Sequence, residues 1–224
     1  MEVRVMPTQP LAIARTPFAP FRSPEPSASD EIRLVGVTKS FGRDQAIYAE
    51  GDAADFVYKV ISGAVRTFRV LADGRRQISD FYLPGDVFGV ELDGERRSGA
   101  EAICETVLLV ARRSAVAEDP AQGQRLWRHA LRQLRRSQDQ ALTLGRRSAS
   151  ERVASFLLDL AQRLGSGDEL ELPMSRQDMA DYLGLTIETV SRTVTQMQGG
   201  GLIRLAGCRR VQLTRPAALT ELCE

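Results

Sequence analysis

Histidine and cysteine are scarce in this sequence, and both shortages exclude classes of site. A single histidine, His129, stands among 224 residues, too few for most acid–base and metal chemistries. The three cysteines, Cys104, Cys208 and Cys223, are odd in number and lack the spacing of a zinc site. We therefore expect no disulfide framework, no metal centre and no catalytic residues, so the sequence disfavours an enzyme.

Long apolar runs and a strong net charge are also missing. No window approaches the roughly eighteen apolar residues of a membrane span, and the N-terminus lacks a signal-peptide core, so we expect a cytoplasmic protein without membrane contact. The net charge is +1: nine arginines face three acids in 112–147, whereas eight arginines face ten acids from residue 148 onward. A nucleic-acid partner must therefore be argued from individual residues.

Glycine and proline divide the chain into segments. The first segment is rich in proline without hydrophobic periodicity, which indicates a mobile arm. The second has short runs of β-formers between glycines spaced 11 or 12 residues apart, with a hairpin turn at Asp73 and Gly74, which predicts a small antiparallel β-roll. The predicted fold class is α+β, with a mobile arm, a β-roll, a dimerisation helix and a winged helix-turn-helix domain over residues 1–29, 30–121, 122–147 and 148–224.

The helix predicted over 122–147 has a stripe of apolar and small residues at spacings of 4, 3, 4, 3 and 4, which is a heptad seam. One interpretation is packing of this stripe on the β-roll. The other is pairing with the same helix of a second copy, which the small residues near its end would allow to approach closely. We assign to a dimer interface the seam residues Trp127, Leu131, Leu134, Gln138, Ala141 and Gly145.

Two short helices joined by a tight turn are predicted in the C-terminal segment. Ser175 is a natural N-cap for the first helix, Gly184 can adopt the left-handed conformation that ends it, and Thr186 caps the second. The stretch LIRLAGCRRVQL follows as a β-hairpin that would form a wing. This pattern predicts a helix-turn-helix, with a plain helical hairpin as the alternative.

Glu188, Ser191 and Arg192 share one face of the second helix because they lie at i, i+3 and i+4. Glu accepts a hydrogen bond from cytosine, Arg donates two to guanine, and Ser can meet a thymine or adenine edge, so a G·C pair flanked by A·T pairs would be read. The alternative without a role in DNA binding is a surface ion pair between Glu188 and Arg192. The candidate DNA-contact set also includes Thr186, Ile187, Thr189, Ser175 and Arg176.

The phrase MSRQDMADYLGLTIETVSRTV, after a β-roll and a long helix, resembles the CRP/FNR superfamily of bacterial transcription regulators, and its E-x-x-S-R spacing resembles the FNR and FixK branches. The resemblance covers about residues 30–220. It implies a β-roll like a cyclic-nucleotide-binding domain and a homodimer that works with RNA polymerase. It further implies a TTGA…TCAA palindrome of double-stranded DNA, read by Glu188, Ser191 and Arg192. Ile187 stands where CRP has an arginine, which disfavours a CRP-type site.

The effector sites of this superfamily are incomplete in the sequence. In GVELDGERRS, Val90 follows Gly89 where cAMP-binding members have glutamate, and the interval to Arg97 and Ser98 is short. The arm has no cysteine, and Cys104 alone cannot hold an iron–sulfur cluster. We therefore expect no cofactor. The branch without either ligand set is FixK, which implies an activator of genes for oxygen limitation and nitrogen fixation.

Other functions stay open from the sequence. A ligand-gated member of the superfamily could sense nitric oxide, haem or another small molecule, with His129 as the candidate haem ligand. Cys208, beside Arg209 and Arg210, could be an oxidisable thiol near DNA. From a different class, the β-roll could be a nucleotide-binding module that regulates an enzyme, although no catalytic constellation accompanies it.

Overall fold

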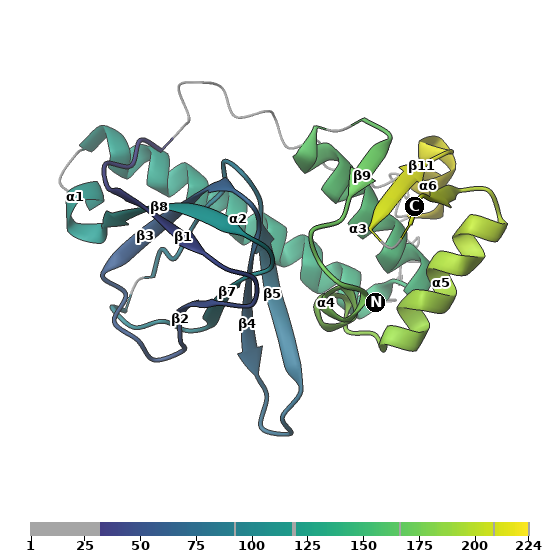
Figure 1. The fold of residues 1–224 in the computed structure, drawn as a ribbon, viewed down its shortest axis with the longest axis horizontal. Helices are drawn as coiled ribbons and strands as arrows, with labels where there is room; N and C mark the ends of the chain where they lie inside the picture. Colours follow the sequence, from purple (N-terminus) through teal and green to yellow (C-terminus); the bar gives the residue numbers. More distant parts are fainter. Residues whose placement is uncertain (1–31, 92, 118–119, 166, 208, 224) are drawn as a thin grey trace, which may run out of the picture.

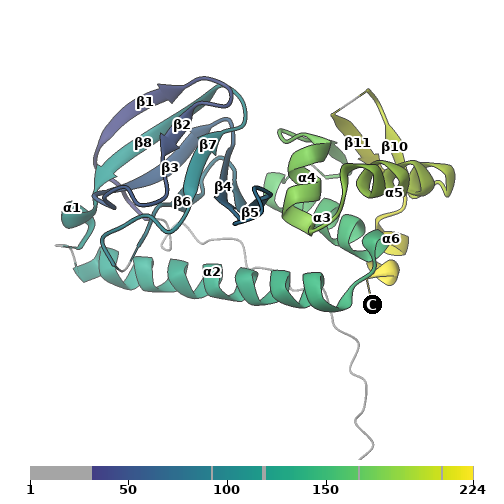
Figure 2. The same ribbon diagram turned by 90° about the horizontal axis from the view of Figure 1, so that it is seen from below.

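A long helix underlies both a β-roll and a smaller helical module (Figure 1 and Figure 2). The predicted α+β class is confirmed. The proline-rich arm predicted for residues 1–29 lies outside the described residues. Residues 116, 117 and 120–122 are described by their backbone alone. The computed structural model describes residues 32–91, 93–117, 120–165, 167–207 and 209–223.

The β-roll consists of two four-stranded antiparallel sheets, with strand orders β1-β8-β3-β6 and β2-β7-β4-β5. The predicted turn at Asp73 and Gly74 is confirmed: Gly74 has a φ of 82°, and the amide of Leu71 donates to the carbonyl of Arg75 over 2.8 Å. The strands are β1 Val37–Phe41, β2 Ala46–Tyr48, β3 Phe56–Ser62, β4 Val65–Val70, β5 Arg76–Tyr82, β6 Val87–Phe88, β7 Gly99–Ala102 and β8 Thr106–Arg112.

The helical module follows α2 and includes a three-stranded sheet of order β10-β11-β9. Helix α2 begins at Pro120, two residues before the predicted start, because proline is tolerated at the first helical position. None of the described helices has the length and apolar character needed to cross a membrane. The remaining elements are α1 Arg113–Ala117, α2 Pro120–Arg146, α3 Ala149–Leu164, β9 Glu169–Glu171, α4 Arg176–Leu183, α5 Ile187–Gly199, β10 Ile203–Leu205, β11 Arg210–Leu213 and α6 Pro216–Leu222.

One apolar core spans the β-roll and the helical module. It joins Ile78 and Phe81 of β5 to the buried faces of α3, α4 and α5. The ring of Phe81 lies 6.0 Å from that of Phe156 and 5.1 Å from that of Tyr182, measured between centroids. Aromatic contacts of this kind add to the stabilisation from burial. The two modules are therefore packed on each other as well as connected by α2.

Helix α2 turns its apolar face outward. Trp127 is 65% exposed, Leu131 42% and Leu134 54%, and the later seam positions are exposed too. The inward side carries Leu126, which packs on the β-roll, and partly buried polar residues, among them Arg136 and Gln140. Packing of the seam on the β-roll is therefore excluded, and the exposed apolar stripe stays a candidate interface.

Replacing Leu157 with alanine is expected to lower the free energy of unfolding by about 2–5 kcal/mol, because its side chain is fully buried in the core that both modules share. Urea unfolding followed by circular dichroism measures this change. The control is Leu71→Ala at the exposed end of the β4–β5 hairpin, which should change stability by less than about 0.5 kcal/mol. Equal losses in the two variants would contradict a shared core at this position.

Candidate DNA interface

Helices α4 and α5 form a helix-turn-helix whose local geometry is as predicted. The hydroxyl of Ser175 accepts from the amide of Asp178, and the carboxylate of Asp178 accepts from the amide of Ser175. The two bonds together form a capping box. Gly184 ends α4 in the left-handed conformation, with a φ of 61°. The hydroxyl of Thr186 accepts from the amide of Thr189 over 3.2 Å and caps α5. Every orphan amide bonded in this way fixes where a helix begins.

The exposed side of α5 brings the predicted reading residues together. Glu188, Ser191 and Arg192 are all exposed and, with Ile187, occupy the first half of the helix. The opposite side is buried in the core through Val190, Thr193, Val194 and Met197. The buried side anchors α5, so the polar side is presented outward on a fixed element.

Candidates at the edge of this surface differ in exposure. Ser175 and Thr186 are exposed and are engaged as helix caps. Thr189 and Arg176 are partly buried, and Arg176 stands at the first position of α4. Ser175 and Arg176 stand at the N-terminus of α4, and Thr186 and Thr189 at the N-terminus of α5, where a helix dipole favours an anion such as phosphate.

Glu188 carries its charge at the start of α5. Its pKa is held below the ordinary value by a backbone hydrogen bond, the hydroxyl of Thr186 and, more weakly, the charge of Arg192. Among the causes that lower this pKa, the charge of Arg192 is the smallest. An ionised carboxylate and a guanidinium on one exposed face offer an acceptor and a bidentate donor to base edges.

Two further polar residues on this surface escaped the sequence reasoning. Thr195 and Gln196 are exposed and continue the polar side of α5 by one turn beyond Ser191 and Arg192. The i+4 spacing was the available signal. The hydroxyl of Thr195 donates to the carbonyl of Ser191 over 3.0 Å.

The predicted wing is confirmed as the hairpin β10–β11, in which Arg204 faces Gln212 across the strands. Exposed arginines, Arg204 and Arg210, supply positive charge on it. Such residues are suited to DNA phosphates rather than to bases. Cys208, the candidate redox residue, lies outside the described residues.

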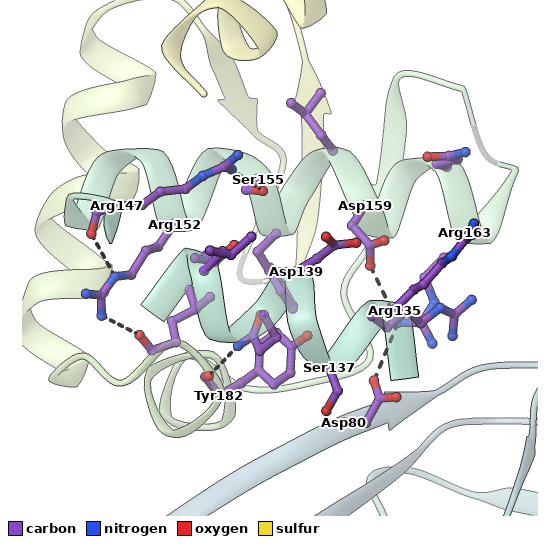
Figure 3. A pocket seen from close by; sticks show the side chains of 18 of the residues that line it. Asp80, Arg135, Ser137, Asp139, Arg147, Arg152, Ser155, Asp159, Arg163 and Tyr182 are labelled. Carbon is purple, nitrogen blue, oxygen red and sulfur yellow. Dashed lines mark hydrogen bonds and ion pairs between the residues drawn. The ribbon is translucent and has the colours of Figure 1, made fainter. Parts of the chain in front are cut away.

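The last carbonyls of α4 are captured by side chains from other helices (Figure 3). Gln140 of α2 donates to the carbonyl of Tyr182 over 3.0 Å. Arg152 of α3 donates to the carbonyl of Leu183 over 2.9 Å and to the carbonyls of Leu144 and Arg147. These carbonyls would otherwise lack a helical partner. The turn before α5 is therefore fixed to α2 and α3.

A cavity of about 530 Å³ lies between α2, α3 and β5 (Figure 3). Two of the arginines in its wall are bonded within the protein: Arg147 donates to the hydroxyl of Ser155, and Arg163 pairs with Asp159, Asp80 and Asp86. Burial raises the pKa of Asp80 to about 6, against the opposing charge of Arg163. The cavity is large enough for a small molecule.

Of the two arginines in the segment GVELDGERRS, the first points into the β-roll and the second points to solvent. Arg96, which is 2% exposed, donates to the carbonyls of Gly89 and Phe56 and lies 4.2 Å from the ring centroid of Tyr48. Arg97 instead points outward, 75% exposed, and pairs with Asp93. The predicted cassette therefore does not present Arg97 to the interior.

His129 lies on the inward side of α2, partly buried against the β-roll, and not on the seam. Burial lowers its pKa, and the nearby Arg132 adds to that effect. Among the described residues no group of three or more His, Cys, Asp or Glu side chains is arranged to hold a metal ion. A haem role for His129 gains no support from this placement.

Comparison with known proteins gives consistent matches. Residues 38–118 match the cyclic nucleotide-binding domain and residues 151–222 the Crp-like helix-turn-helix domain. The nitrogen fixation regulation protein FixK of Rhizobium meliloti is 47% identical over 88% of this chain and 91% of its own length. The transcriptional activatory protein AadR of Rhodopseudomonas palustris is 39% identical over 80% of this chain and 78% of its own length. The structure of FixK2 from Bradyrhizobium japonicum superposes with a TM-score of 0.82 at 42% identity. The match covers 85% of this chain and 98% of the FixK2 chain.

Replacing Thr186 with alanine is expected to destabilise the helical module by about 1 kcal/mol, because the amide of Thr189 loses its acceptor. Urea unfolding of the purified protein measures the loss. Thr186→Ser keeps the hydroxyl and should retain most of the stability. If serine and alanine behaved alike, the hydroxyl would not be the cap.

Proposed function

We propose that this chain, which belongs to the CRP/FNR family of transcription regulators, binds a TTGA…TCAA-type palindrome as a homodimer and activates genes used under oxygen limitation together with RNA polymerase, without cAMP or an iron–sulfur cluster. Its relatives include proteins named as transcription activators, among them AadR and FnrL, and its own residues 151–222 match a helix-turn-helix domain. The oxygen-limitation role is supported by the likeness to nitrogen fixation regulation proteins and to a protein named as an anaerobic regulatory protein. We assign 30–121 to a sensor-like β-roll, 122–147 to dimerisation and 148–224 to DNA binding.

The observation that carries this function is the exposed polar side of α5. Glu188, Ser191 and Arg192 project from one side of a helix whose other side is buried. A helix of this kind fits the major groove, where its first residues meet base edges. Arg192 is assigned to guanine, Glu188 to cytosine and Ser191 to a neighbouring A·T pair.

The homodimer is supported by the outward apolar side of α2. Exposed Trp127, Leu131 and Leu134 need a covering partner, and the same seam on a second copy matches their heptad spacing. A two-fold dimer presents two α5 helices to two half-sites, which explains a palindromic target.

Binding without cAMP is supported by the β-roll interior. The guanidinium of Arg96 fills space between aromatic rings, and its Nη1 and Nη2 donate to the carbonyls of Gly89 and Phe56. Val90 offers no carboxylate for a ribose hydroxyl, and Arg97 is directed to solvent. A nucleotide would have to displace paired groups without gaining the usual partners.

A ligand-gated sensor is the second candidate function, favoured by the cavity between α2, α3 and β5. A small molecule bound there would contact the elements that hold α4. This candidate predicts that purified protein is inactive until the ligand is supplied.

Fluorescence anisotropy separates the two candidates. Freshly purified, reduced protein is titrated in air onto the palindrome and onto a scrambled duplex at one stated salt concentration, with no ligand added. Strong preference for the palindrome supports the effector-independent function. Absence of preference, with binding restored by a cell extract or anaerobic reconstitution, would favour the ligand-gated sensor instead.

Arg192→Ala is expected to reduce discrimination at the G·C pair by about 1–3 kcal/mol, because a bidentate guanine contact is lost. Anisotropy on the palindrome and on single-base variants of it measures the change. The matched control is Arg210→Ala in the wing, which should weaken binding to all duplexes about equally. A uniform loss for Arg192→Ala as well would refute a base-reading role.

Leu134→Glu is expected to yield monomers that bind the palindrome weakly, because a charge is placed in the seam and two half-sites are no longer read together. Analytical ultracentrifugation gives the oligomeric state, and anisotropy gives the affinity. Leu71→Glu, at an exposed leucine outside α2, is the control and should remain dimeric. A dimeric Leu134→Glu variant would place the interface elsewhere.

A further inference from the structure

The N-terminal end of α4 is bound by two arginines of the β-roll. Arg66 of β4 and Arg76 of β5 both donate to Oδ1 of Asp178, over 3.1 and 2.7 Å. Arg76 also donates to Asp181, one turn further along α4, over 2.9 Å. Asp178 is 3% exposed and Arg66 7%, so this ion-pair cluster is shielded from water. Glu101 holds Arg66 from its other side, over 2.7 Å.

The same carboxylate also caps α4. Its second oxygen, Oδ2, accepts from the amide of Ser175 over 3.0 Å and from its hydroxyl over 2.7 Å. Both oxygens of Asp178 are therefore bonded, one within the helical module and the other to the β-roll. A tilt of α4 away from the β-roll would break the bonds of Oδ1 to Arg66 and Arg76, so a buried carboxylate oxygen would lose both of its charged donors, which is unfavourable.

A second cluster joins the modules with the charges reversed. Arg163 of α3 donates to the carbonyl of Phe81 and pairs with Asp86 of the β-roll over 2.8 Å. Asp80 lies 4.0 Å from the same guanidinium (Figure 3). The first cluster places arginines on the β-roll, and this one places an arginine on the helical module. Between them lies the contact of Phe81 with Tyr182.

We propose that Arg66, Arg76 and Arg163 are positioning residues for DNA binding. Their ion pairs lock the helix-turn-helix in its DNA-binding orientation without a bound effector. The inference rests on the proposed binding of a palindrome by a homodimer. None of the three arginines belongs to the candidate DNA-contact set. Arg66 and Arg76 act through α4, and Arg163 acts through α3.

The geometry of a dimer on DNA explains why orientation matters. Two half-sites lie about 34–36 Å apart, so both reading helices must be correctly placed at once. When only a fraction of molecules has the competent orientation, the apparent dissociation constant rises by the inverse of that fraction. Loss of the ion pairs therefore weakens binding without removing any DNA contact.

The test compares Arg76→Gln/Arg163→Gln with Arg69→Gln. Arg69 is the matched control because it lies on β4, the strand paired with that of Arg76. Its partner is Glu50 of the same β-roll, and this ion pair is exposed. Affinity for the palindrome should fall about tenfold in the double variant and stay within about twofold in the control. The dependence of affinity on salt should keep its wild-type slope, because no phosphate contact is lost.

A conservative pair of substitutions provides the second readout. Arg76→Lys/Arg163→Lys keeps both positive charges facing Asp178 and Asp86, so it should recover much of the affinity that the double glutamine variant loses. Arg76→Gln alone, at the more exposed of the two arginines, decides the matter if the double glutamine variant fails to fold. Wild-type affinity in the double glutamine variant, or absence of recovery in the lysine variant, would overturn the lock. A wild-type protein that does not prefer the palindrome would instead overturn the proposed function.

Discussion

The carboxylate of Asp178 is bonded from two modules at once, and the arrangement of the molecule depends on it. One oxygen completes the N-terminus of α4, and the other receives arginines from β4 and β5. At the opposite end of α4, Gln140 and Arg152 take the carbonyls of the last turn. A helix of only eight residues is thus held at both ends by groups outside itself. Since α5 follows α4 after a short turn, the reading surface inherits this fixed position.

Helix α2 has an exposed apolar side and an inward side that bonds to α4. A helix that belonged to a monomer would turn its apolar side to the core, but α2 exposes Trp127 and Leu134 and directs Gln140 inward. The polar inward side bonds to α4, and the apolar outward side is available to a second copy. In the proposed homodimer, dimerisation and placement of the helix-turn-helix would use opposite sides of α2, which would connect half-site spacing to the fold.

Local signals made much of the fold predictable, whereas contacts between modules left no pattern in the sequence. The left-handed turn at Gly184 and the cap at Thr186 depend on neighbours within a few residues, so residue type and spacing identify them. The bond from Arg66 to Asp178 joins residues 112 positions apart, and neither period nor composition marks it. Likewise, the arginine that turns into the β-roll is Arg96, one residue before the arginine of the predicted cassette, a choice set by the packing of aromatic rings.

The locked orientation determines where control of DNA binding can act. A ligand shifts a conformational equilibrium only by its difference in affinity between the two states, so a protein already held in the competent state gains little from an effector. The ion pairs of the proposed lock lie within one chain, so under the proposed function each protomer would be set before it meets its partner. Assembly on the α2 seam would then be the remaining step, and it would respond to concentration by mass action. Occupancy of a palindrome would follow the amount of protein, which would make synthesis and turnover the natural points of regulation.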